Sequence, residues 1–392
     1  MWRAVASNAL SLLILVLILA AGVLAWGREQ YRGPGPLSAA ICLRVERGAS
    51  LSAVSRSLEE QGAITDARVF RIGASYSGKA EQVRFGSYLV EPTTSMRDIL
   101  RQLTGGGAST CGREVNYRIG VTTAELVLRE LDPGLNEFVE VVKFDPAAVA
   151  EAPAEYTDVA QEPDLRFRVT LAEGVTSWQV VDALGRAEFM VGDVSQVPPE
   201  GTLAPGSYEV ERGADRAGLL AEMTVLQAGI LAEAWDARAS DLPYDTPQEA
   251  LVMASIVEKE TGIAEERRLV ASVFVNRLRQ GMKLQTDPTV IYGVTRGEAA
   301  LGRGLRQSEL RRETPYNTYV IDGLPPTPIA NPGRASIEAA MNPDTSDFLF
   351  FVADGTGGHA FAETLKAHNE NVARWREIEA QAGQEGATGV QE

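Results

Sequence analysis

A long apolar run opens the chain, and no charged residue occurs from Ala4 to Gly27. At ~1.5 Å rise per residue, a helix of this length spans a hydrocarbon core of about 30 Å. Trp2 and Trp26 stand at the two ends of the run, where an aromatic belt would place them. The pattern predicts a transmembrane anchor over residues 4–26. The alternative is a cleaved signal peptide, whose apolar region is typically shorter, roughly 7–15 residues.

After this run, short alternating segments and amphipathic segments follow one another. Gly48 separates the first strand pattern from the first helix, and three glycines end the last helix. The elements are a strand, two helices, a returning strand and a further helix, at 41–47, 50–61, 66–73, 83–90 and 95–103. This order predicts a small α+β module over residues 41–106.

Part of this pattern recurs. Residues 167–171 predict a strand followed by a helix, and GSYEV at 206–210 echoes GSYLV at 86–90. A third start at 117–122 precedes a predicted helix that ends at Leu131. We interpret this as internal duplication of a small α+β unit, with chance similarity of amphipathic segments as the alternative.

A single carboxylate stands on an apolar helix face in the second half of the chain. Residues 248–259 predict a helix in which Leu251, Ala254 and Glu258 share one face. Desolvation disfavours the charged form of a carboxylate, and a general acid for a glycosidic oxygen needs a retained proton. The alternative is a solvated surface cluster of Glu258, Lys259 and Glu260, since carboxylates are mostly exposed.

A dense polar stretch follows a second helix at 265–280 that ends at Gly281. Residues 284–293, LQTDPTVIYG, place Gln, Thr, Asp and Tyr among apolar residues. Such a density of donors and acceptors suits a sugar-binding wall. The alternative is a loop in which Asp287 and Pro288 begin the next helix. The other predicted elements are a long helix, a short helix capped by Ser336 and a buried strand, at 219–239, 336–341 and 348–353.

Composition adds two limits. The net charge of −16 argues against a nucleic-acid partner, because such proteins usually present a basic face. Cys42 and Cys111 could form one disulfide in an oxidising compartment, but sequence gives no geometry to decide it. Two cysteines with His359 and His368 are too few and too scattered for a metal site.

Six ordered motifs resemble the endolytic murein transglycosylase family (MltG, or YceG-like). They are ASIVEKET at 254–261, VASVFVNRL at 270–278, LQTDPTVIYG at 284–293, TPYNTY at 314–319, GLPPTPIANPG at 323–333, and FVADG with GH at 351–355 and 358–359. The resemblance is strong over residues 248–371. The amino-terminal half is similar in layout more than in letters.

Pattern and resemblance together predict an α+β fold. It has an N-terminal transmembrane helix, small LysM-like α+β modules with peptidoglycan as the implied ligand, and a C-terminal mixed α/β catalytic domain. The expected parts are a cytoplasmic tip with the anchor, a linker, a LysM-like module, an insertion with a linker, a second partial module, a YceG-like catalytic domain and a disordered tail. Their boundaries are 1–28, 29–40, 41–106, 107–164, 165–240, 241–379 and 380–392.

The resemblance implies cleavage of the β-1,4 bond between N-acetylmuramic acid and N-acetylglucosamine within glycan strands. The muramic C6 hydroxyl attacks C1 and leaves a 1,6-anhydro end, so no water is consumed. Glu258 is the expected acid and base, because one carboxyl group can protonate the leaving oxygen and then accept the hydroxyl proton. No cofactor or metal is implied. The expected substrate-binding residues are Gln285, Asp287, Tyr292, Asn276, Asn317 and Tyr319.

The resemblance also decides the expected location, because the basic residues flanking the apolar run are nearly balanced. It implies a single-pass inner-membrane protein with a cytoplasmic N-terminus, a periplasmic catalytic domain, a role in ending nascent strands and peptidoglycan synthases as candidate partners. Two alternatives stay open. One is a hydrolytic muramidase that uses Glu258 with Asp287, or with Glu260 as the second carboxylate. The other is a non-catalytic, membrane-anchored peptidoglycan-binding scaffold.

Overall fold

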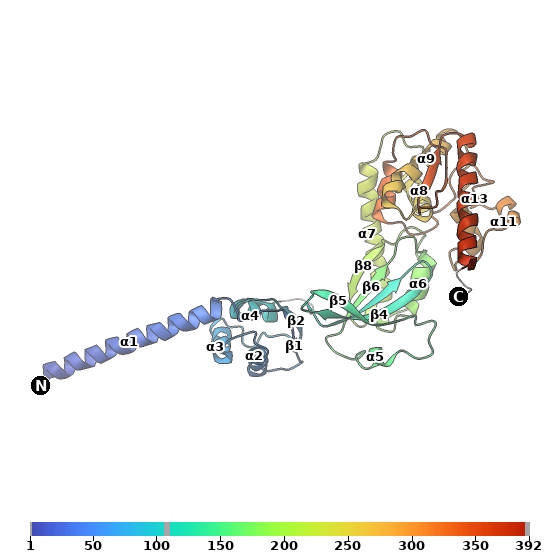
Figure 1. Ribbon diagram of the computed structural model, residues 1–392. Coiled ribbons are helices and arrows are strands. Elements are labelled where there is room, and N and C mark those ends of the chain that lie inside the picture. Colours follow the sequence, from blue (N-terminus) through green and yellow to red (C-terminus); the bar gives the residue numbers. More distant parts are fainter. Residues whose placement is uncertain (1, 106–109, 389–392) are drawn as a thin grey trace. The chain divides into compact units, whose positions relative to one another are not determined.

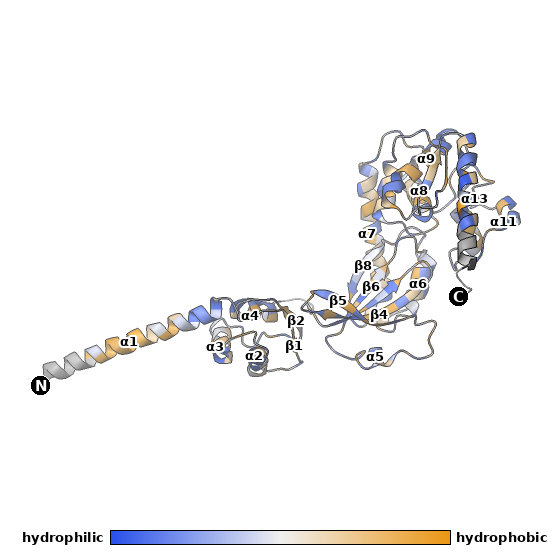
Figure 2. Ribbon diagram, in the orientation of Figure 1, coloured by the Kyte–Doolittle hydropathy of each residue, from blue (hydrophilic) through white to orange (hydrophobic). Residues whose placement is uncertain are grey.

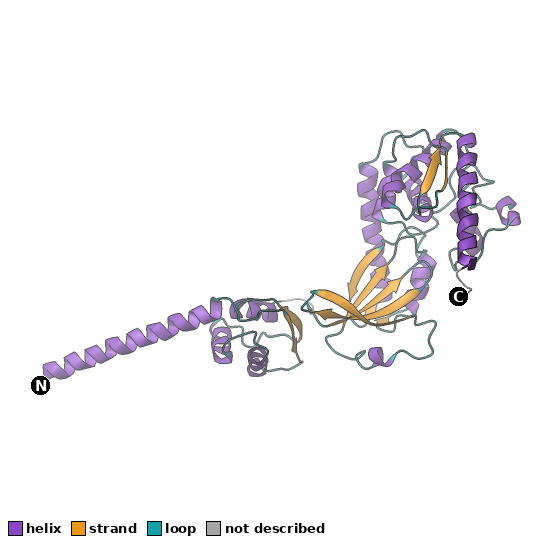
Figure 3. Cartoon of the chain, viewed as in Figure 1, coloured by secondary structure: helices purple, strands orange, loops and turns teal. Residues whose placement is uncertain are grey.

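The computed structural model describes residues 2–105 and 110–388, and it is mixed α+β (Figures 1 and 3). The chain divides into two compact units. The first unit holds residues 1–116, 127–144 and 151–167, and the second holds the remaining residues. Each unit has its own buried core, one around residues 37–103 and one around residues 204–341.

Helix α1, Trp2–Arg32, carries the apolar run (Figure 2). Its part from Leu10 to Arg32 is long and apolar enough to cross a membrane, and the side chains of its apolar stretch are exposed. Helix α7, Arg216–Asp236, meets the same test of length and composition. One face of α7 packs into a core through residues such as Met223 and Ile230. Of these two helices, α7 thus buries apolar side chains against the rest of the protein, whereas the apolar side chains of α1 are exposed.

The predicted small module has its elements in the expected order. They are β1 Ile41–Val45, α2 Leu51–Glu60, α3 Ala67–Tyr76, β2 Gly86–Val90 and α4 Met96–Thr104. Strands β1 and β2 pair antiparallel, and Ser50, Asp66 and Ser95 cap the three helices with their side chains. Leu58 and Phe70 are fully buried between these elements.

Cys42 and Cys111 form a disulfide, which settles the question that the sequence leaves open. The bond joins β1 to the segment that leads into the next strand. Beside it, the Leu89 N–H of β2 donates to the Thr110 hydroxyl at 2.8 Å. The disulfide therefore ties the end of the small module to its own sheet.

We predict that replacing both cysteines by alanine lowers the free energy of unfolding of this part of the chain by about 2–4 kcal/mol. The bond closes a loop across 69 residues, which restricts the unfolded chain. Hydrogen exchange of the β1 and β2 amides measures the change locally. Equal protection in the variant and the parent protein would show that the disulfide adds nothing.

The largest sheet has five strands in the order β5-β4-β3-β6-β8. They are β3 Arg113–Ile119, β4 Ala124–Asp132, β5 Glu137–Phe144, β6 Arg166–Leu171 and β8 Gly206–Val210. The predicted helix up to Leu131 is wrong, because this segment is β4. The residues favour a helix by propensity, but pairing with β3 and burial of apolar side chains on both faces of the strand override it. Within the described residues of 107–164, three sheet strands thus stand where the sequence suggested an insertion and linker.

Shorter elements complete this region. They are α5 Ala154–Thr157, α6 Ser177–Gly185, β7 Met190–Val191 and β9 Ala214–Asp215. Strands β7 and β9 pair in parallel. A capping box formed by Thr176 and Gln179 begins α6, as the predicted helix at this place requires.

Helix α8, Pro247–Glu260, is the central helix of the second core (Figure 1). A capping box of Thr246 and Glu249 begins it, with Pro247 in the first turn. It packs against α7, α9 and α12. The remaining elements are the 3₁₀ turn η1 Ala264–Glu266, α9 Arg267–Arg279, α10 Asp287–Thr295, α11 Gln307–Arg311, α12 Arg334–Met341, β10 Phe350–Ala353, β11 His359–Ala362 and α13 Leu365–Thr388.

Two predicted boundaries in this part differ from the structure. Ser336 does not cap a helix, because α12 already begins at Arg334 and Ser336 is buried within it. Helix α13 continues to Thr388, into the range 380–392 that the sequence suggested as a disordered tail. Ala, Gln and Glu in this stretch are good helix formers even though the stretch is polar. Residues 389–392 lie outside the described residues.

Candidate active site

The last turn of α8 carries three charged residues out of the core. Every residue from Ala250 to Val257 is buried, whereas Glu258, Lys259 and Glu260 keep part of their surface exposed. Successive residues of a helix are turned by about 100°, so the two glutamates point to nearly opposite sides. They therefore enter different polar clusters.

The Glu258 cluster connects α8 to the start of α12. The Gly333 N–H donates to a Glu258 carboxylate oxygen at 3.0 Å, and Gly333 is the N-cap of α12. Gly333 also lies directly against the carboxylate of Glu173, where a side chain would collide. Burial raises the pKa of Glu173, and the negative charge of Glu258 raises it further. Glu258 is thus held by a backbone donor at a helix N-terminus, a place that stabilises negative charge.

The Glu260 cluster connects α8 to the polar stretch before α10. The Thr286 hydroxyl donates to the Glu260 carboxylate. Asp287 follows directly and is exposed, and the Tyr319 hydroxyl donates to it at 2.7 Å. Burial and the acceptor Asp287 both raise the pKa of Tyr319, so its hydroxyl stays a donor. This cluster combines a carboxyl group, an oriented second carboxylate and hydroxyl donors.

The environment of Glu260 favours its protonated form. Burial of the carboxyl group raises the pKa of Glu260, and the nearby charge of Asp287 raises it further. The Thr286 hydrogen bond and the cationic forms of His359 and Arg277 act in the opposite direction. A raised pKa lets a carboxyl group hold its proton to higher pH than usual, and a general acid benefits from this property.

Two cationic or basic side chains, Arg277 and His359, lie near the Glu260 carboxyl group. Arg277 is buried and donates to the carbonyl oxygens of Leu284 and Leu349. The His359 ring lies 2.7 Å, through Nδ1, from the Glu266 carboxylate, which also accepts the backbone N–H of His359 at 2.9 Å. Both side chains are therefore fixed in place near Glu260.

The loop that presents Thr286 is fixed by buried hydroxyls. The Thr286 N–H donates to the Thr318 hydroxyl at 3.0 Å, and the Thr318 and Thr289 hydroxyls lie 2.9 Å apart. Gln285 has φ +49°, a left-handed conformation that costs energy in a non-glycine residue. Its N–H donates to the Thr318 carbonyl at 3.1 Å, and its side chain is exposed. The strained residue directly precedes Thr286, whose hydroxyl donates to Glu260.

Asp287 and Tyr319 are in direct contact, and Gln285 stands two residues before Asp287 in the chain. Tyr292 lies elsewhere and donates to Glu200 at 3.2 Å. The side-chain NH₂ group of Asn276 donates to two backbone carbonyl oxygens. The side-chain NH₂ group of Asn317 donates to three.

Sequence reasoning did not select three side chains of the Glu260 cluster. They are Thr286, Arg277 and His359. Thr286 stands inside the predicted polar stretch, so a signal for it existed. Arg277 and His359 come from α9 and β11 and stand in two of the motifs that carry the family resemblance, but local periodicity does not indicate that they lie near Glu260.

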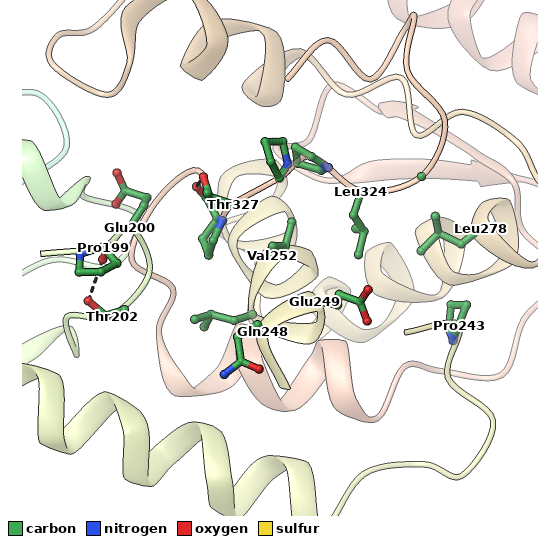
Figure 4. Close-up of a pocket in the computed structure, with 15 residues that line it drawn as sticks. Pro199, Glu200, Thr202, Pro243, Gln248, Glu249, Val252, Leu278, Leu324 and Thr327 are labelled. Atoms are coloured by element: carbon green, nitrogen blue, oxygen red, sulfur yellow. Dashed lines mark hydrogen bonds between the residues drawn. The ribbon is translucent and has the colours of Figure 1, made fainter. Parts of the chain in front are cut away.

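Two cavities lie near α8. One of about 650 Å³ is mainly apolar, with Val252, Leu278 and Leu324 in its wall, and neither Glu258 nor Glu260 lines it (Figure 4). The other, of about 370 Å³, is lined by Lys259 and by residues along α10 from Pro288 to Thr295. Lys259 donates to the Gly174 carbonyl at 3.1 Å, and burial lowers its pKa. The second cavity therefore adjoins the turn that carries both glutamates.

The described residues contain no group of three or more His, Cys, Asp or Glu side chains that could hold a metal ion.

Known proteins are similar in sequence to most of this chain. The sequence profile of the YceG-like family matches residues 43–134 and 146–374. A Bacillus subtilis protein named Endolytic murein transglycosylase is 27% identical over 331 residues, which are 84% of this chain and 83% of that protein. A protein of the same name from Streptococcus pneumoniae is 26% identical over 351 residues, 85% of this chain but only 58% of its own length. A solved YceG-like structure from Listeria monocytogenes covers 84% of this chain and 98% of its own, with 25% identity and a TM-score of 0.45.

Proposed function

Because the chain belongs to the YceG-like family, we propose that it is an endolytic murein transglycosylase, the name carried by its relatives. The proposed reaction cleaves the β-1,4 bond between N-acetylmuramic acid and N-acetylglucosamine inside glycan strands and leaves a 1,6-anhydro end. The observation that carries the proposal is the Glu260 carboxyl group. It has a raised pKa, it is partly exposed, and it stands beside a polar wall.

The proposed mechanism uses one carboxyl group twice. The protonated group gives its proton to the glycosidic oxygen as the bond from C1 to that oxygen breaks. The C6 hydroxyl oxygen then bonds to C1, and its proton passes to the carboxylate, which restores the acid. Atoms balance without water, and the enzyme ends in its starting protonation state.

Two glutamates compete for this role. Glu258 is the candidate that the sequence suggested, and it remains one. The surroundings favour Glu260, because Glu258 is tethered to the Gly333 N–H whereas Glu260 stands with Thr286 and Asp287. We propose Glu260 as the acid and base, and Glu258 as the group that holds α8 to α12.

The Asp287 carboxylate is proposed to stabilise the positive charge of the transition state and to orient the substrate. The Tyr319 hydroxyl fixes its carboxylate, which is exposed beside Glu260. Glycoside cleavage passes through a positively charged, oxocarbenium-like transition state, which a nearby carboxylate stabilises. Gln285 and Tyr319 are proposed to bind hydroxyl or acetamido groups. Tyr292, Asn276 and Asn317 are proposed as further contacts to the glycan strand, and each also has a hydrogen-bond partner inside the protein.

We predict opposite pH shifts for two neighbouring substitutions. The acid must be protonated, so cleavage is lost as the pH rises through the pKa of Glu260. Asp287→Asn removes a charge that raises this pKa, so the alkaline limb of the rate profile moves to lower pH. Thr286→Val removes a hydrogen-bond donor that lowers the pKa of Glu260, so the alkaline limb moves to higher pH. Rates of strand cleavage across pH measure both, and shifts in the same direction would contradict the assignment.

The remaining parts of the proposal concern place and partners. We propose that α1 anchors the chain in the inner membrane, with a cytoplasmic N-terminus and a periplasmic catalytic part. The module at 41–106 is proposed to be LysM-like and to bind peptidoglycan, and the enzyme is proposed to end nascent strands beside peptidoglycan synthases. The apolar length of α1 and the strand-helix-helix-strand order support these proposals.

Product length tests the endolytic part. The full-length protein in detergent is incubated with long, uncrosslinked glycan strands, and the early products are separated by length. Internal cleavage predicts intermediate lengths before disaccharides accumulate. Disaccharides alone from the first time point would contradict it, and no cleavage at all would favour the binding-scaffold alternative.

A further inference from the structure

Helix α3 presents an exposed stripe that its own module does not cover. Ile72 is 68% exposed and Tyr76 95% exposed, and Arg68 is exposed one turn earlier. Residues four apart lie above one another on a helix, so these three form one stripe. The opposite face of α3 buries Phe70 and Ala74 in the core of the module. Two large exposed side chains on such a small module indicate a contact surface.

The end of α1 packs beside this stripe. The Tyr31 ring lies against Gly73, the residue after Ile72, and leaves no room for a side chain there. The Thr65 hydroxyl donates to the Gln30 side-chain oxygen at 2.7 Å. The end of α1 is therefore packed against the module. These two contacts fix α3 beside the end of α1.

The rise of the helix gives the height of this contact. Tyr31 stands four positions after Gly27, the last residue of the apolar run, which corresponds to about 6 Å along a helix. The headgroup region on one side of a bilayer is about 5–8 Å thick. If α1 fills the hydrocarbon core, α3 lies at the level of the lipid headgroups. A tyrosine and an arginine suit that level, because each combines an apolar body with a polar end.

Charge around the stripe differs from that of the chain. The end of α1, helix α2, helix α3 with its N-cap residue and helix α4, at 28–32, 51–60, 66–76 and 96–104, contain seven arginines and five carboxylates. Two of the carboxylates bind the first turn of α3: Asp66 caps it, and Glu59 accepts the backbone N–H of Ala67. The whole chain has a net charge of −16, so this local excess of positive charge stands out. Arginines at headgroup level attract anionic phospholipids.

The geometry points to a membrane contact: we propose that Arg68, Ile72 and Tyr76 insert into the anionic headgroup layer of the bilayer that α1 enters. The inference rests on the proposed anchoring by α1, and it adds a second point of attachment. Two attachments would fix the module against tilting on the membrane. The module would then be a peripheral membrane element as well as a proposed peptidoglycan binder.

Site-directed spin labelling of the full-length protein in vesicles tests this. Labels go on cysteines introduced one at a time as Ser75→Cys beside the stripe, Leu19→Cys in α1 and Asn369→Cys on α13. Among the described residues both native cysteines are paired and do not take the label. The vesicles contain phosphatidylcholine with or without phosphatidylglycerol, and collision with a water-soluble nickel chelate reports exposure to water.

We expect the Ser75 label to meet nickel several-fold less often than the Asn369 label in anionic vesicles. Adding Ile72→Ser and Tyr76→Ser should return it to the Asn369 level. Equal accessibility at Ser75 and Asn369 in the otherwise unchanged protein, or no response to the double substitution, would overturn the membrane contact. A Leu19 label as accessible as Asn369 would instead remove the anchoring on which it rests. Glycan cleavage, measured separately, is independent of all three labels.

Discussion

Replacing Glu260 by glutamine is expected to lower the rate of glycan cleavage by about 10³-fold, within the usual effect of removing a general acid. Glutamine keeps the size of the side chain and can still pair with the Thr286 hydroxyl. It has no proton to give to the leaving oxygen and cannot accept one from the C6 hydroxyl. Strand cleavage per unit time measures the loss, with thermal unfolding to show that the variant is folded.

Glu258→Gln is the matched control on the same turn of α8. Its amide can still accept the Gly333 N–H, so the link between α8 and α12 is kept. We expect most of the activity to remain. A severe loss in Glu258→Gln with an active Glu260→Gln would reverse the assignment and return the catalytic role to Glu258.

Asn317→Asp is expected to lower the free energy of unfolding by about 3–5 kcal/mol, the usual cost of an unpaired buried charge. Asn317 is 0% exposed, and its NH₂ group donates to the carbonyl oxygens of Glu309, Leu310 and Arg312. Aspartate has the same shape, but its carboxylate oxygen would face the three carbonyl oxygens with no hydrogen to donate. Chemical denaturation followed by hydrogen exchange of residues 309–319 measures the effect.

The exposed Asn369 provides the control, since Asn369→Asp changes the same atoms on the surface. We expect no measurable change in stability there. If Asn317→Asp kept the parent stability but raised the KM for glycan strands, Asn317 would be a substrate-binding residue, as the resemblance suggests, and its structural role would be minor.

The sequence predicted the local architecture well where caps and periodicity define an element. The capping side chains of Ser50, Asp66 and Ser95 begin the helices of the small module as expected. Gly281, at φ +65°, follows α9 as a left-handed terminus. These signals act within a few residues, so one sequence carries them completely.

Long-range pairing was harder to predict. The segment that forms β4 has helix-forming residues, and only its partner strands make it a strand. The disulfide between Cys42 and Cys111 likewise depends on the spatial approach of distant segments. Both features depend on contacts that local patterns do not contain.

The two candidate glutamates of α8 differ in features that the local sequence pattern does not contain. The sequence argument placed Glu258 on an apolar face through Leu251 and Ala254. The structure buries α8 on all sides up to Val257, so an apolar face does not distinguish one glutamate from the other. The difference comes from Thr286 and Gly333, which approach from other parts of the chain.

The most direct test of the central claim is the mass of the new strand ends formed in ¹⁸O-labelled water. The full-length protein cleaves glycan strands, and mass spectrometry compares the ends made by the parent protein and by Glu260→Gln. A transglycosylase that uses Glu260 predicts 1,6-anhydro ends, lighter than reducing ends by one water and free of ¹⁸O, which disappear in the variant. Reducing ends that carry ¹⁸O would contradict the claim and identify a hydrolase, with Asp287 as the candidate second carboxylate.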